Sequence, residues 1–299
     1  MIAACATTRL RGELRVDAPL ECLNSWRVGG TAERLYRPAD IEDLVLFLST
    51  LDVTEPLFWL GLGTNVLVRD GGVCGTVIAV HAALNRISQL SPLRIHVQAG
   101  VPCAKLARFS TARSLAGAEF MVGIPGSLGG ALAMNAGAFG GQTWDVVASV
   151  ETVDRWGNVW QRLPAEFNVG YRDVGLPAEE WFLGAELELS VGDKAISLDK
   201  IKTLLAKRQM SQPLGVASCG SVFRNPPGDF AARLIETAGL KGYCLGGARV
   251  SDKHANFIIN TGNATAAEIE ALIEHVQRHV ADVHGVQLIP EVRIMGEHA

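Results

Sequence analysis

The sequence has no long hydrophobic run and no excess of positive charge. None of its apolar stretches approaches the ~20 residues that a helix needs to span a bilayer, so a membrane segment is not expected. The net charge is −4, and no cluster of lysine and arginine alternates with aromatic residues. Nucleic acid is therefore not an expected partner, although a few local cations could hold a small anionic ligand.

Cysteine pairs at metal or redox spacing are also missing. The six cysteines form no CxxC pair and no cluster with histidine, so we expect no metal site and read them as reduced, mostly buried thiols of a cytoplasmic protein. The segment MIAACATT has no basic region, and charged residues follow it closely, so no secretory signal is predicted. The cysteines are Cys5, Cys22, Cys74, Cys103, Cys219 and Cys244.

Two familiar phosphate-binding signatures are missing from the glycine-rich stretch Glu119 to Gly141. Its glycines are not followed by Gly-Lys-Ser/Thr, and it contains no strand–GxGxxG–helix fingerprint. Glycine permits close backbone approach and φ > 0, so this segment, which lacks lysine and arginine, offers N–H groups to a phosphate or ring system. A flexible linker is the alternative, but linkers are rich in polar residues, whereas this stretch carries many apolar side chains.

A second glycine turn lies in LFWLGLGTNVLVRDGGVCG, which predicts a strand, a turn and another strand. Gly61, Gly63, Thr64 and Asn65 lie where a tight turn can direct backbone N–H groups at a pyrophosphate. A plain β-turn is the alternative.

The first two thirds of the 299 residues predict many strands and few helices. Asp40 is expected to cap a helix, and another helix is expected from Pro102 to Ser114, with the proline at its start. Strands are predicted at 32–38, 77–81, 94–98 and 182–189, with a hairpin around Trp156-Gly157-Asn158. Because no βαβ repeat appears, we expect an α+β fold and not a Rossmann fold.

The last third predicts more helix. One helix is marked by Ile201, Leu204 and Leu205, and a short one by Leu234, Ile235 and Ala238, ended by Gly239. Thr265 and Glu268 predict a capping box. The helix that follows should bury one apolar face and leave its histidines solvated, and a final strand should carry residues 290–293. The apolar face is Ile269, Leu272, Ile273, Val276, Val280 and Val283; the histidines are His275, His279 and His284.

The segment GIPGSLGGALAMNAGAFG resembles the flavin-cradling loop of UDP-N-acetylenolpyruvoylglucosamine reductases, the MurB family. Further blocks are similar to the family in the same order, with Thr64 in place of serine in the second loop; they are 24–30, 61–65, 219–226, 240–257 and 290–293. The resemblance runs from about Asn24 to Gly296. It implies a two-lobed FAD-binding domain of the vanillyl-alcohol oxidase (PCMH) type, in residues 1–82 and 83–195, and a small α+β substrate-binding domain in 196–299.

The reaction that the resemblance implies is reduction of UDP-N-acetylglucosamine-enolpyruvate to UDP-N-acetylmuramate, with NADPH supplying electrons through non-covalent FAD. Arg172 would stabilise the enolate charge that develops on the substrate carboxylate. Ser221 would donate a proton to C2. Glu291 would either hydrogen-bond the carboxylate as a protonated acid or relay a proton. Taken singly, Ser221 could equally be a turn residue and Glu291 with Arg293 a surface ion pair.

The resemblance also implies binding residues. For FAD they are Gly61, Gly63, Thr64, Asn65, Gly123, Ile124, Pro125, Gly126, Ser127, Gly129, Gly130, Asn135, Ala136 and Gly137. For the substrate they are Tyr171, Gln212, Asn225, Lys241 and His254. Other members carry glutamine at the position of His254, and a buried core histidine is the alternative there. Only 48 residues separate Arg172 from Ser221, so the chain resembles the shorter subgroup, which lacks a tyrosine lid.

Three other functions are alternatives for this sequence. An oxidase with flavin linked to histidine is disfavoured, because His81 and His96 lie outside the glycine loops. An electron-carrier subunit would not need Arg172, Ser221 and Glu291, and a sugar-nucleotide-binding module would be colourless. The oligomeric state is not determined by the sequence, and a monomer is compatible with it.

Overall fold

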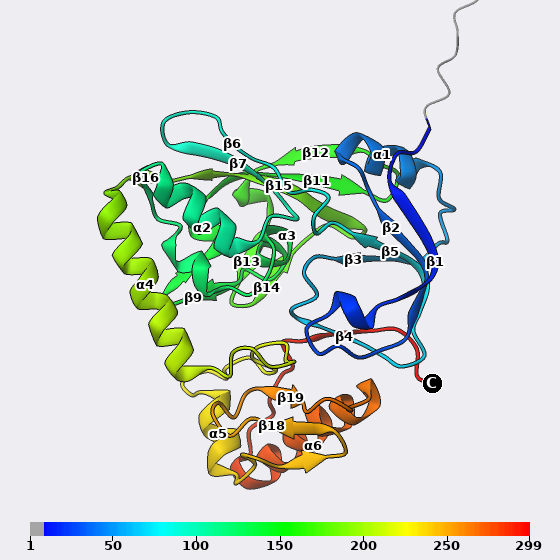
Figure 1. Cartoon of the computed structure of the whole chain (residues 1–299), viewed down its shortest axis with the longest axis vertical. Helices are drawn as coiled ribbons and strands as arrows, with labels where there is room; N and C mark the ends of the chain where they lie inside the picture. The colour runs from blue at the N-terminus through cyan, green and yellow to red at the C-terminus, as the bar shows by residue number, and fades with distance from the viewer. Residues whose placement is uncertain (1–8) are drawn as a thin grey trace, which may run out of the picture.

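A four-stranded mixed sheet forms the first lobe in the computed structural model, which describes residues 9–299 (Figure 1). MIAACATT and Cys5 lie outside the described residues. The strand order is β1-β2-β5-β3, in which β2, β5 and β3 are parallel and β1 is antiparallel to β2. The strands are β1 (Glu13–Pro19), β2 (Thr31–Arg37), β3 (Leu57–Leu60) and β5 (Val73–Ala79).

Helix α1 (Ile41–Ser49) packs against this sheet, and its N-cap is the predicted Asp40, whose side chain accepts a hydrogen bond from the Asp43 N–H at 2.9 Å. The strand predicted at 77–81 begins earlier, at Val73, and ends at Ala79.

A five-stranded antiparallel sheet forms the second lobe, in the order β12-β11-β15-β7-β6. The predicted hairpin is confirmed as β11 (Val147–Asp154) and β12 (Val159–Arg162), and β7 (Arg94–Gln98) matches its prediction. The other two strands are β6 (Ile87–Gln89) and β15 (Glu180–Glu188).

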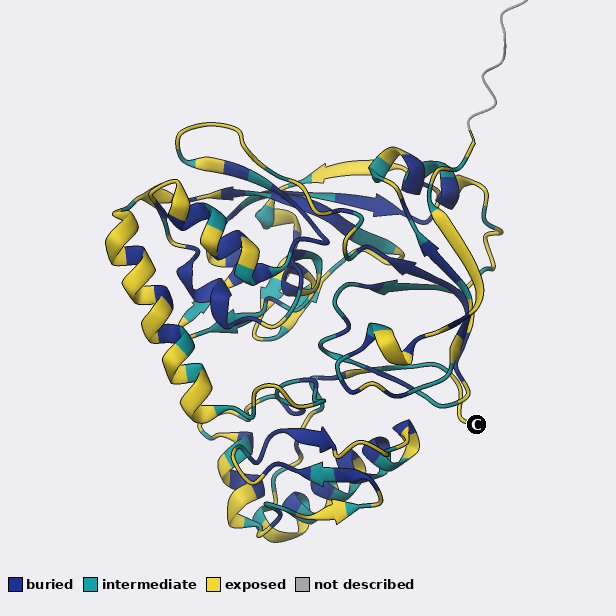
Figure 2. Ribbon diagram, viewed as in Figure 1, coloured by how far each residue is buried: buried dark blue, intermediate teal, exposed yellow. Residues whose placement is uncertain are grey.

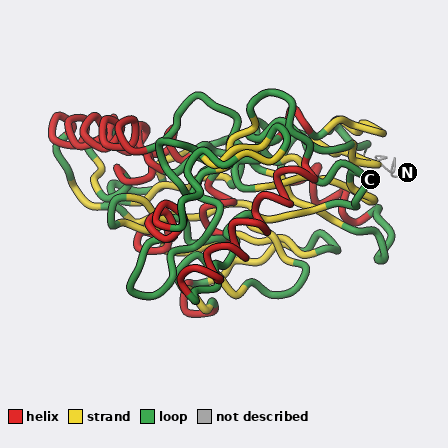
Figure 3. Tube along the Cα trace, turned by 90° about the horizontal axis from the view of Figure 1, so that it is seen from below, coloured by secondary structure: helices red, strands yellow, loops and turns green. Residues whose placement is uncertain are grey.

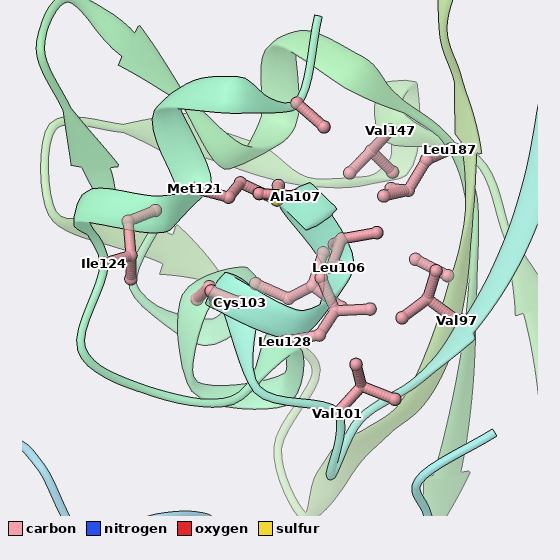
Figure 4. Packing of buried hydrophobic residues seen from close by; sticks show 14 of the residues in the cluster. Val97, Val101, Cys103, Leu106, Ala107, Met121, Ile124, Leu128, Val147 and Leu187 are labelled. Carbon is pink, nitrogen blue, oxygen red and sulfur yellow. The ribbon is translucent and has the colours of Figure 1, made fainter. Parts of the chain in front are cut away.

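Helices α2 (Cys103–Ala112) and α3 (Leu128–Ala133) cover the second sheet together with the 3-10 turn η2 (Glu119–Gly123). Figure 4 shows Leu106 and Leu128 directed toward Val97 of the sheet. Pro102 was expected to be the first helical residue of α2. It is the N-cap, one position earlier, because its ψ of 133° is extended.

Short elements complete the two lobes. They are β4 (Val66–Val68), β8 (Leu115–Ala116), β9 (Gly137–Ala138), β10 (Gly141–Gln142), β13 (Asn168–Gly170), β14 (Asp173–Gly175) and β16 (Ser190–Val191), with the 3-10 turns η1 (Glu21–Leu23), η3 (Thr143–Val146) and η4 (Pro164–Glu166).

The long helix α4 (Lys194–Ser211) connects the second lobe to the C-terminal part (Figure 1). Most of its surface is exposed (Figure 2), and it lies at the edge of the molecule opposite the C-terminus (Figure 3). The division proposed at 82/83 falls between β5 and β6, and the one at 195/196 falls in the first turn of α4. These boundaries stay a proposal.

The C-terminal part is a three-stranded sheet with two helices. The sheet is β17 (Cys244–Leu245), β18 (Ala248–Val250) and β19 (Ile258–Asn260); the helices are α5 (Ala231–Thr237) and α6 (Ala266–His284). The capping box of Thr265 and Glu268 is confirmed. Val283 was expected on the buried face of α6 but is 50% exposed, because the core that covers this helix ends at Val280.

The expectation that the α6 histidines are solvated is wrong, because all three are partly buried and the His275 ring stacks on Tyr243. His279 and His284 are partly buried, and their Nε2 atoms lie 3.1 Å from the carbonyl oxygens of Ala238 and Leu234. Ala238 is the C-cap of α5, where carbonyls lack intrahelical donors, whereas the Leu234 carbonyl also accepts from the Ala238 N–H. No group of three metal-ligating side chains occurs among residues 9–299.

The C-terminal part is joined closely to the first lobe. Trp26 Nε1–H donates to the Ile258 carbonyl at 2.8 Å, and Trp26 packs in the same core as α6. Strand β20 (Arg293–Met295) pairs in parallel with β4. The last strand was predicted over 290–293 but begins only at Arg293, because Pro290 bridges to Phe223 and the Glu291 N–H donates to the Val222 carbonyl.

The cysteines differ from the expectation of mostly buried thiols. Cys103 and Cys219 are buried, whereas Cys22, Cys74 and Cys244 are exposed, and all five are free. The exposed ones lie in η1, on the outward-facing side of β5 and in the short strand β17. Across the part of the chain that the structure describes, no helix is both long enough and apolar enough to cross a membrane.

Candidate active site

A cavity of about 390 Å³ lies where the two lobes and the C-terminal part meet. We call it the central cavity. The turn 61–65 between β3 and β4 forms one wall, and the glycine-rich loop that leads from η2 to β9 forms another. Arg172, Ser221 and Glu291 all line this cavity. The structure therefore brings together three side chains that are up to 119 positions apart in the sequence.

The two glycine loops face each other closely. A Cβ atom on Gly61 would lie 2.4 Å from Ser127 Oγ, and one on Gly126 would lie 3.3 Å from Thr64 Oγ1. Within residues 9–299, the N–H groups of 61–65 and of Gly126 and Ser127 have no backbone acceptor. Ser127 Oγ is buried and also has no partner. Such a concave set of unpaired donors fits the pyrophosphate of FAD.

Twelve of the fourteen residues predicted to bind FAD line the central cavity, and Gly129 and Asn135 do not. The Gly129 N–H donates to the Ala99 carbonyl at 2.8 Å, so it faces the second sheet. The Asn135 side chain is buried, where it donates to the Gly170 carbonyl and accepts from the Trp144 N–H. Both residues therefore support the glycine-rich loop on the side that faces away from the central cavity.

Arg172 lies in the turn between β13 and β14 in a left-handed conformation, with φ +55°. Its Nη2 donates to the Gly137 carbonyl at 3.1 Å, which ties the guanidinium to the glycine-rich loop. Its Nε lies 3.1 Å from Glu291 Oε1, but this N–H has no acceptor in line with it. The guanidinium thus keeps donor capacity for a further anion.

Glu291 is an unusual carboxyl group because its side chain is only 14% exposed. Burial raises its pKa above the ordinary value, and the positive charges of Arg172 and Arg224 offset part of that effect. A carboxyl with a raised pKa beside a cavity is suited to carry or donate a proton.

Ser221 follows the buried Cys219 in the segment that enters the cavity. Cys219 Sγ lies 3.4 Å from the Val66 carbonyl, and burial raises the pKa of this thiol to about 12. The thiol therefore stays neutral and attaches the Ser221 segment to β4, next to the turn 61–65.

Of the five residues predicted to bind the substrate, only Gln212 lines the central cavity. Asn225 Oδ1 accepts from the Ala231 N–H at the start of α5, and Lys241 pairs with Glu236 at 2.6 Å. Tyr171 is 56% exposed beside Arg172. Burial lowers the pKa of His254, whose ring packs edge-on against Phe257 of the cavity wall.

Several wall residues were not predicted. Trp59, Met134, Phe139, Phe257 and Arg293 add apolar surface and one cation. Arg293 lies within the block 290–293, so its position in the sequence could have indicated it. Met134 and Phe139 lie in the glycine-rich segment and Phe257 in the block 240–257, so their positions could have indicated them too, whereas Trp59 lies outside the blocks.

Comparisons with known proteins agree with this geometry. Residues 32–161 match the family described as FAD binding domain, and residues 212–295 match UDP-N-acetylenolpyruvoylglucosamine reductase, C-terminal domain. UDP-N-acetylenolpyruvoylglucosamine reductase of Methylococcus capsulatus is 58% identical over 99% of this chain and 97% of its own length. The corresponding protein of Legionella pneumophila is 56% identical over 97% and 94%.

A solved structure is similar over nearly its whole length. The crystal structure of UDP-N-acetylenolpyruvylglucosamine reductase (MurB) from Thermus caldophilus superposes with a TM-score of 0.83 at 31% identity, covering 96% of this chain and all of the other.

Proposed function

The chain belongs to the UDP-N-acetylenolpyruvoylglucosamine reductase family, and from this membership we propose how its residues divide the work of the reaction. It is an FAD-dependent oxidoreductase that reduces UDP-N-acetylglucosamine-enolpyruvate to UDP-N-acetylmuramate with NADPH, a step of peptidoglycan precursor synthesis. The observation that carries the assignment of residues is the convergence of Arg172, Ser221 and Glu291 on one cavity walled by both glycine loops.

The glycine loops hold the cofactor. The unpaired N–H groups of 61–65, with those of Gly126 and Ser127, bind the pyrophosphate, and the Ser127 hydroxyl supplies one more hydrogen bond. When bound, FAD would supply the hydride-transfer chemistry that links NADPH to the enolpyruvyl substrate. The remaining requirements, charge and protons, fall to side chains of this chain.

Arg172 holds the substrate carboxylate. Its hydrogen bond to the Gly137 carbonyl fixes the guanidinium beside the glycine-rich loop, so the positive charge is already in place when negative charge develops on C2 and the carboxylate. A preorganised donor of this kind typically contributes ~10²–10³ in rate. Burial raises the pKa of Glu291, and in its protonated form this carboxyl donates a hydrogen bond to the same carboxylate.

Ser221 donates the proton that completes the reduction at C2. Serine is a weak acid, but a carbanion-like C2 is basic enough to take its proton, and general-acid steps contribute ~10²–10⁴ in rate. The segment that carries Ser221 is attached to β4 through Cys219, which positions the hydroxyl relative to the turn 61–65.

The substrate's uridine diphosphate reaches outward from the cavity past Gln212. Arg208 Nε–H donates to Gln212 Oε1 at 3.1 Å and orients that amide. Tyr171, Asn225, Lys241 and His254 lie outside the cavity wall, so we assign them to the outer part of the substrate or to closure around it. The partner is thus a small molecule; the net charge of −4 argues against nucleic acid, and the scattered free thiols favour a cytoplasmic protein.

The test is the flavin absorbance of the purified protein under anaerobic conditions. The spectrum is recorded after one equivalent of NADPH and again after addition of UDP-N-acetylglucosamine-enolpyruvate. We expect bleaching and then full recovery. Bleaching without recovery would indicate a different acceptor, and well-folded, FAD-supplemented protein without a flavin signal would contradict the assignment of both glycine loops.

A further inference from the structure

A second cavity, of about 470 Å³, lies on the other side of the turn 61–65. We call it the basic pocket, and we define it by Arg27, Arg37 and His81 with the hydroxyls of Ser25 and Ser218, all of which line it. Arg37 ends β2 and His81 follows β5, so two of its basic side chains come from the carboxyl ends of parallel strands. Ligands commonly bind at such strand ends in open sheets.

The basic pocket is separate from the central cavity. Successive residues of a strand point to opposite faces, and β3 accordingly gives Trp59 to the central cavity and Leu60 to the basic pocket. The two share only Gly61 and Leu62. The central cavity takes residues 123–139 and Arg172 from the second lobe, whereas the described lining of the basic pocket includes none from 83–195.

The charge of the basic pocket is not balanced locally. Its described lining contains no aspartate or glutamate. Arg37 pairs with Glu13 through Nη1 at 3.3 Å, at the exposed side, and Arg27 forms no ion pair with any residue in 9–299. Arg27 and Arg37 thus present positive charge that is costly to gather without a counterion.

Two polar atoms of the basic pocket are buried and have no hydrogen-bond partner among residues 9–299. They are Arg37 Nε and His81 Nδ1. A buried donor that makes no hydrogen bond costs roughly 1–3 kcal/mol, which an anionic acceptor would recover. Arg27 has a left-handed backbone, with φ +58°, which an ordinary arginine adopts only where the surrounding structure enforces it.

We propose that the basic pocket binds a phosphate-bearing anion in addition to FAD. The positive charges and unpaired donors select the phosphate group, and the volume is within the ~300–1,000 Å³ of small-molecule sites, enough for a mononucleotide. Gly215, Val216 and Ser218 of its wall lead directly to Cys219 and Ser221. The ligand therefore contacts the segment that carries the proposed proton donor.

The experiment is isothermal titration of the FAD-loaded protein with pyrophosphate and, separately, with AMP. We expect saturable binding of one molecule per chain with no release of flavin. Tighter binding of AMP than of pyrophosphate would indicate a nucleotide as the natural ligand, and the reverse order a free phosphate compound. Both orders support the site.

Two variants locate the binding. Arg27→Ala removes an exposed side chain and should lower affinity at least tenfold, and Arg27→Ala with His81→Gln should abolish binding. Arg108→Ala is the matched control, because it removes an exposed arginine of α2 that forms no ion pair among residues 9–299, and it should leave affinity unchanged. Flavin content should equal that of the parent protein in all three.

Three results would overturn the proposal. The first is no binding of pyrophosphate or AMP to the FAD-loaded protein at concentrations on the order of 10 mM. The second is an equal loss of affinity in Arg27→Ala and Arg108→Ala. The third is binding that is seen only when FAD is removed. The last would show the probes occupying the FAD site. None of these depends on turnover, so failure here would leave the assignment of the central cavity untouched.

Discussion

The Ser221 hydroxyl and the Glu291 carboxyl line one cavity but differ in how far their surroundings alter them. Burial raises the pKa of Glu291, whose side chain is 14% exposed, while Arg172 limits the rise. Ser221 owes its position to the buried Cys219 two residues before it. At the scale of single residues, the proposed role of Glu291 thus depends on burial of its carboxyl group, and that of Ser221 on the contact that positions its segment.

Ser221→Ala should retain bound flavin and its reduction by NADPH. Flavin reoxidation by the enolpyruvyl substrate should slow by ~10²–10⁴, because only that step needs a proton at C2. Stopped-flow absorbance of the two half-reactions measures both rates, with the exposed Ser211→Ala as control. Equal slowing of both half-reactions would remove Ser221 from the role of proton donor.

Glu291→Gln tests the protonated carboxyl. In the parent protein, reoxidation by substrate should slow as pH rises through the raised pKa of Glu291, since an ionised carboxylate repels the substrate carboxylate. Folding stability should follow the same direction: the folded protein favours the protonated form, so the contribution is present at low pH and is lost as pH rises through the raised pKa.

The glutamine variant should show neither dependence. Rates and urea midpoints measured from pH 5 to pH 9 give both profiles, and an unchanged alkaline decrease in the variant would assign it to another group.

Within the second sheet, His96 of β7 and Glu151 of β11 meet across the intervening β15. His96 Nε2 lies 3.1 Å from Glu151 Oε2, and a Cβ on Gly184 would lie 3.2 Å from the same nitrogen, so glycine leaves room for the contact. This hydrogen bond, which the Glu151 carboxylate accepts, raises the pKa of His96 and lowers the pKa of Glu151.

The stability from this pair should depend on pH at both ends. The histidine contribution is present below its ordinary pKa and is lost as pH rises through the raised value; the glutamate contribution is lost as pH falls through its lowered value. His96→Gln should therefore lower the free energy of unfolding by about 1 kcal/mol near pH 6 and by less at pH 9. Urea unfolding measures the difference, and the double variant with Glu151→Gln should cost no more than either single one.

Asp70 joins two parts of the molecule through one helix end. Its carboxylate accepts from the N–H groups of Ala266 and Ala267, at 3.0 and 2.9 Å, although α6 is almost 200 positions away. Asp70→Ala should lower the free energy of unfolding by ~1 kcal/mol, because two N-terminal donors of α6 lose a charged acceptor. The exposed Asp252→Ala is a control, and equal unfolding midpoints for the two variants would contradict a stabilising role of the Asp70 hydrogen bonds to α6.

Across the whole molecule, the first lobe shares one core with the C-terminal part and another with β11 and β15 of the second lobe, and polar contacts bridge the central cavity between them. Arg172 with Glu291 is one, and Asn65 Nδ2 with Met134 Sδ, at 3.0 Å, is another. FAD held by both glycine loops would therefore connect the lobes.

Removing FAD should accordingly lower thermal stability. Binding to the folded state alone stabilises by about 2.7 kcal/mol at a free ligand concentration of 100 Kd, so the Tm of flavin-free protein should rise steadily with added FAD. Riboflavin, which lacks the pyrophosphate, should raise it much less. A Tm that does not respond to FAD would show that the loops do not hold the cofactor.

The sequence by itself determined the local features of this protein. The cap at Asp40, the box of Thr265 and Glu268, the hairpin of β11 and β12 and both glycine turns follow from short-range hydrogen bonding and backbone sterics, which act within a few residues. The ordered blocks also indicated the family, and with it the three residues that we propose as catalytic.

Only the tertiary structure decided which side chains face a cavity. In the structure, Gly129, Asn135 and four of the five predicted substrate-binding residues do not line the central cavity. Val283 is exposed, and His279 and His284 lie within hydrogen-bond distance of carbonyls at the end of α5. The structure also gathered Arg27, Arg37 and His81, which no motif connects. The burial of a side chain and its hydrogen-bond partners depend on elements that are distant in the chain. A short stretch of sequence therefore identifies only one of the two residues in each contact.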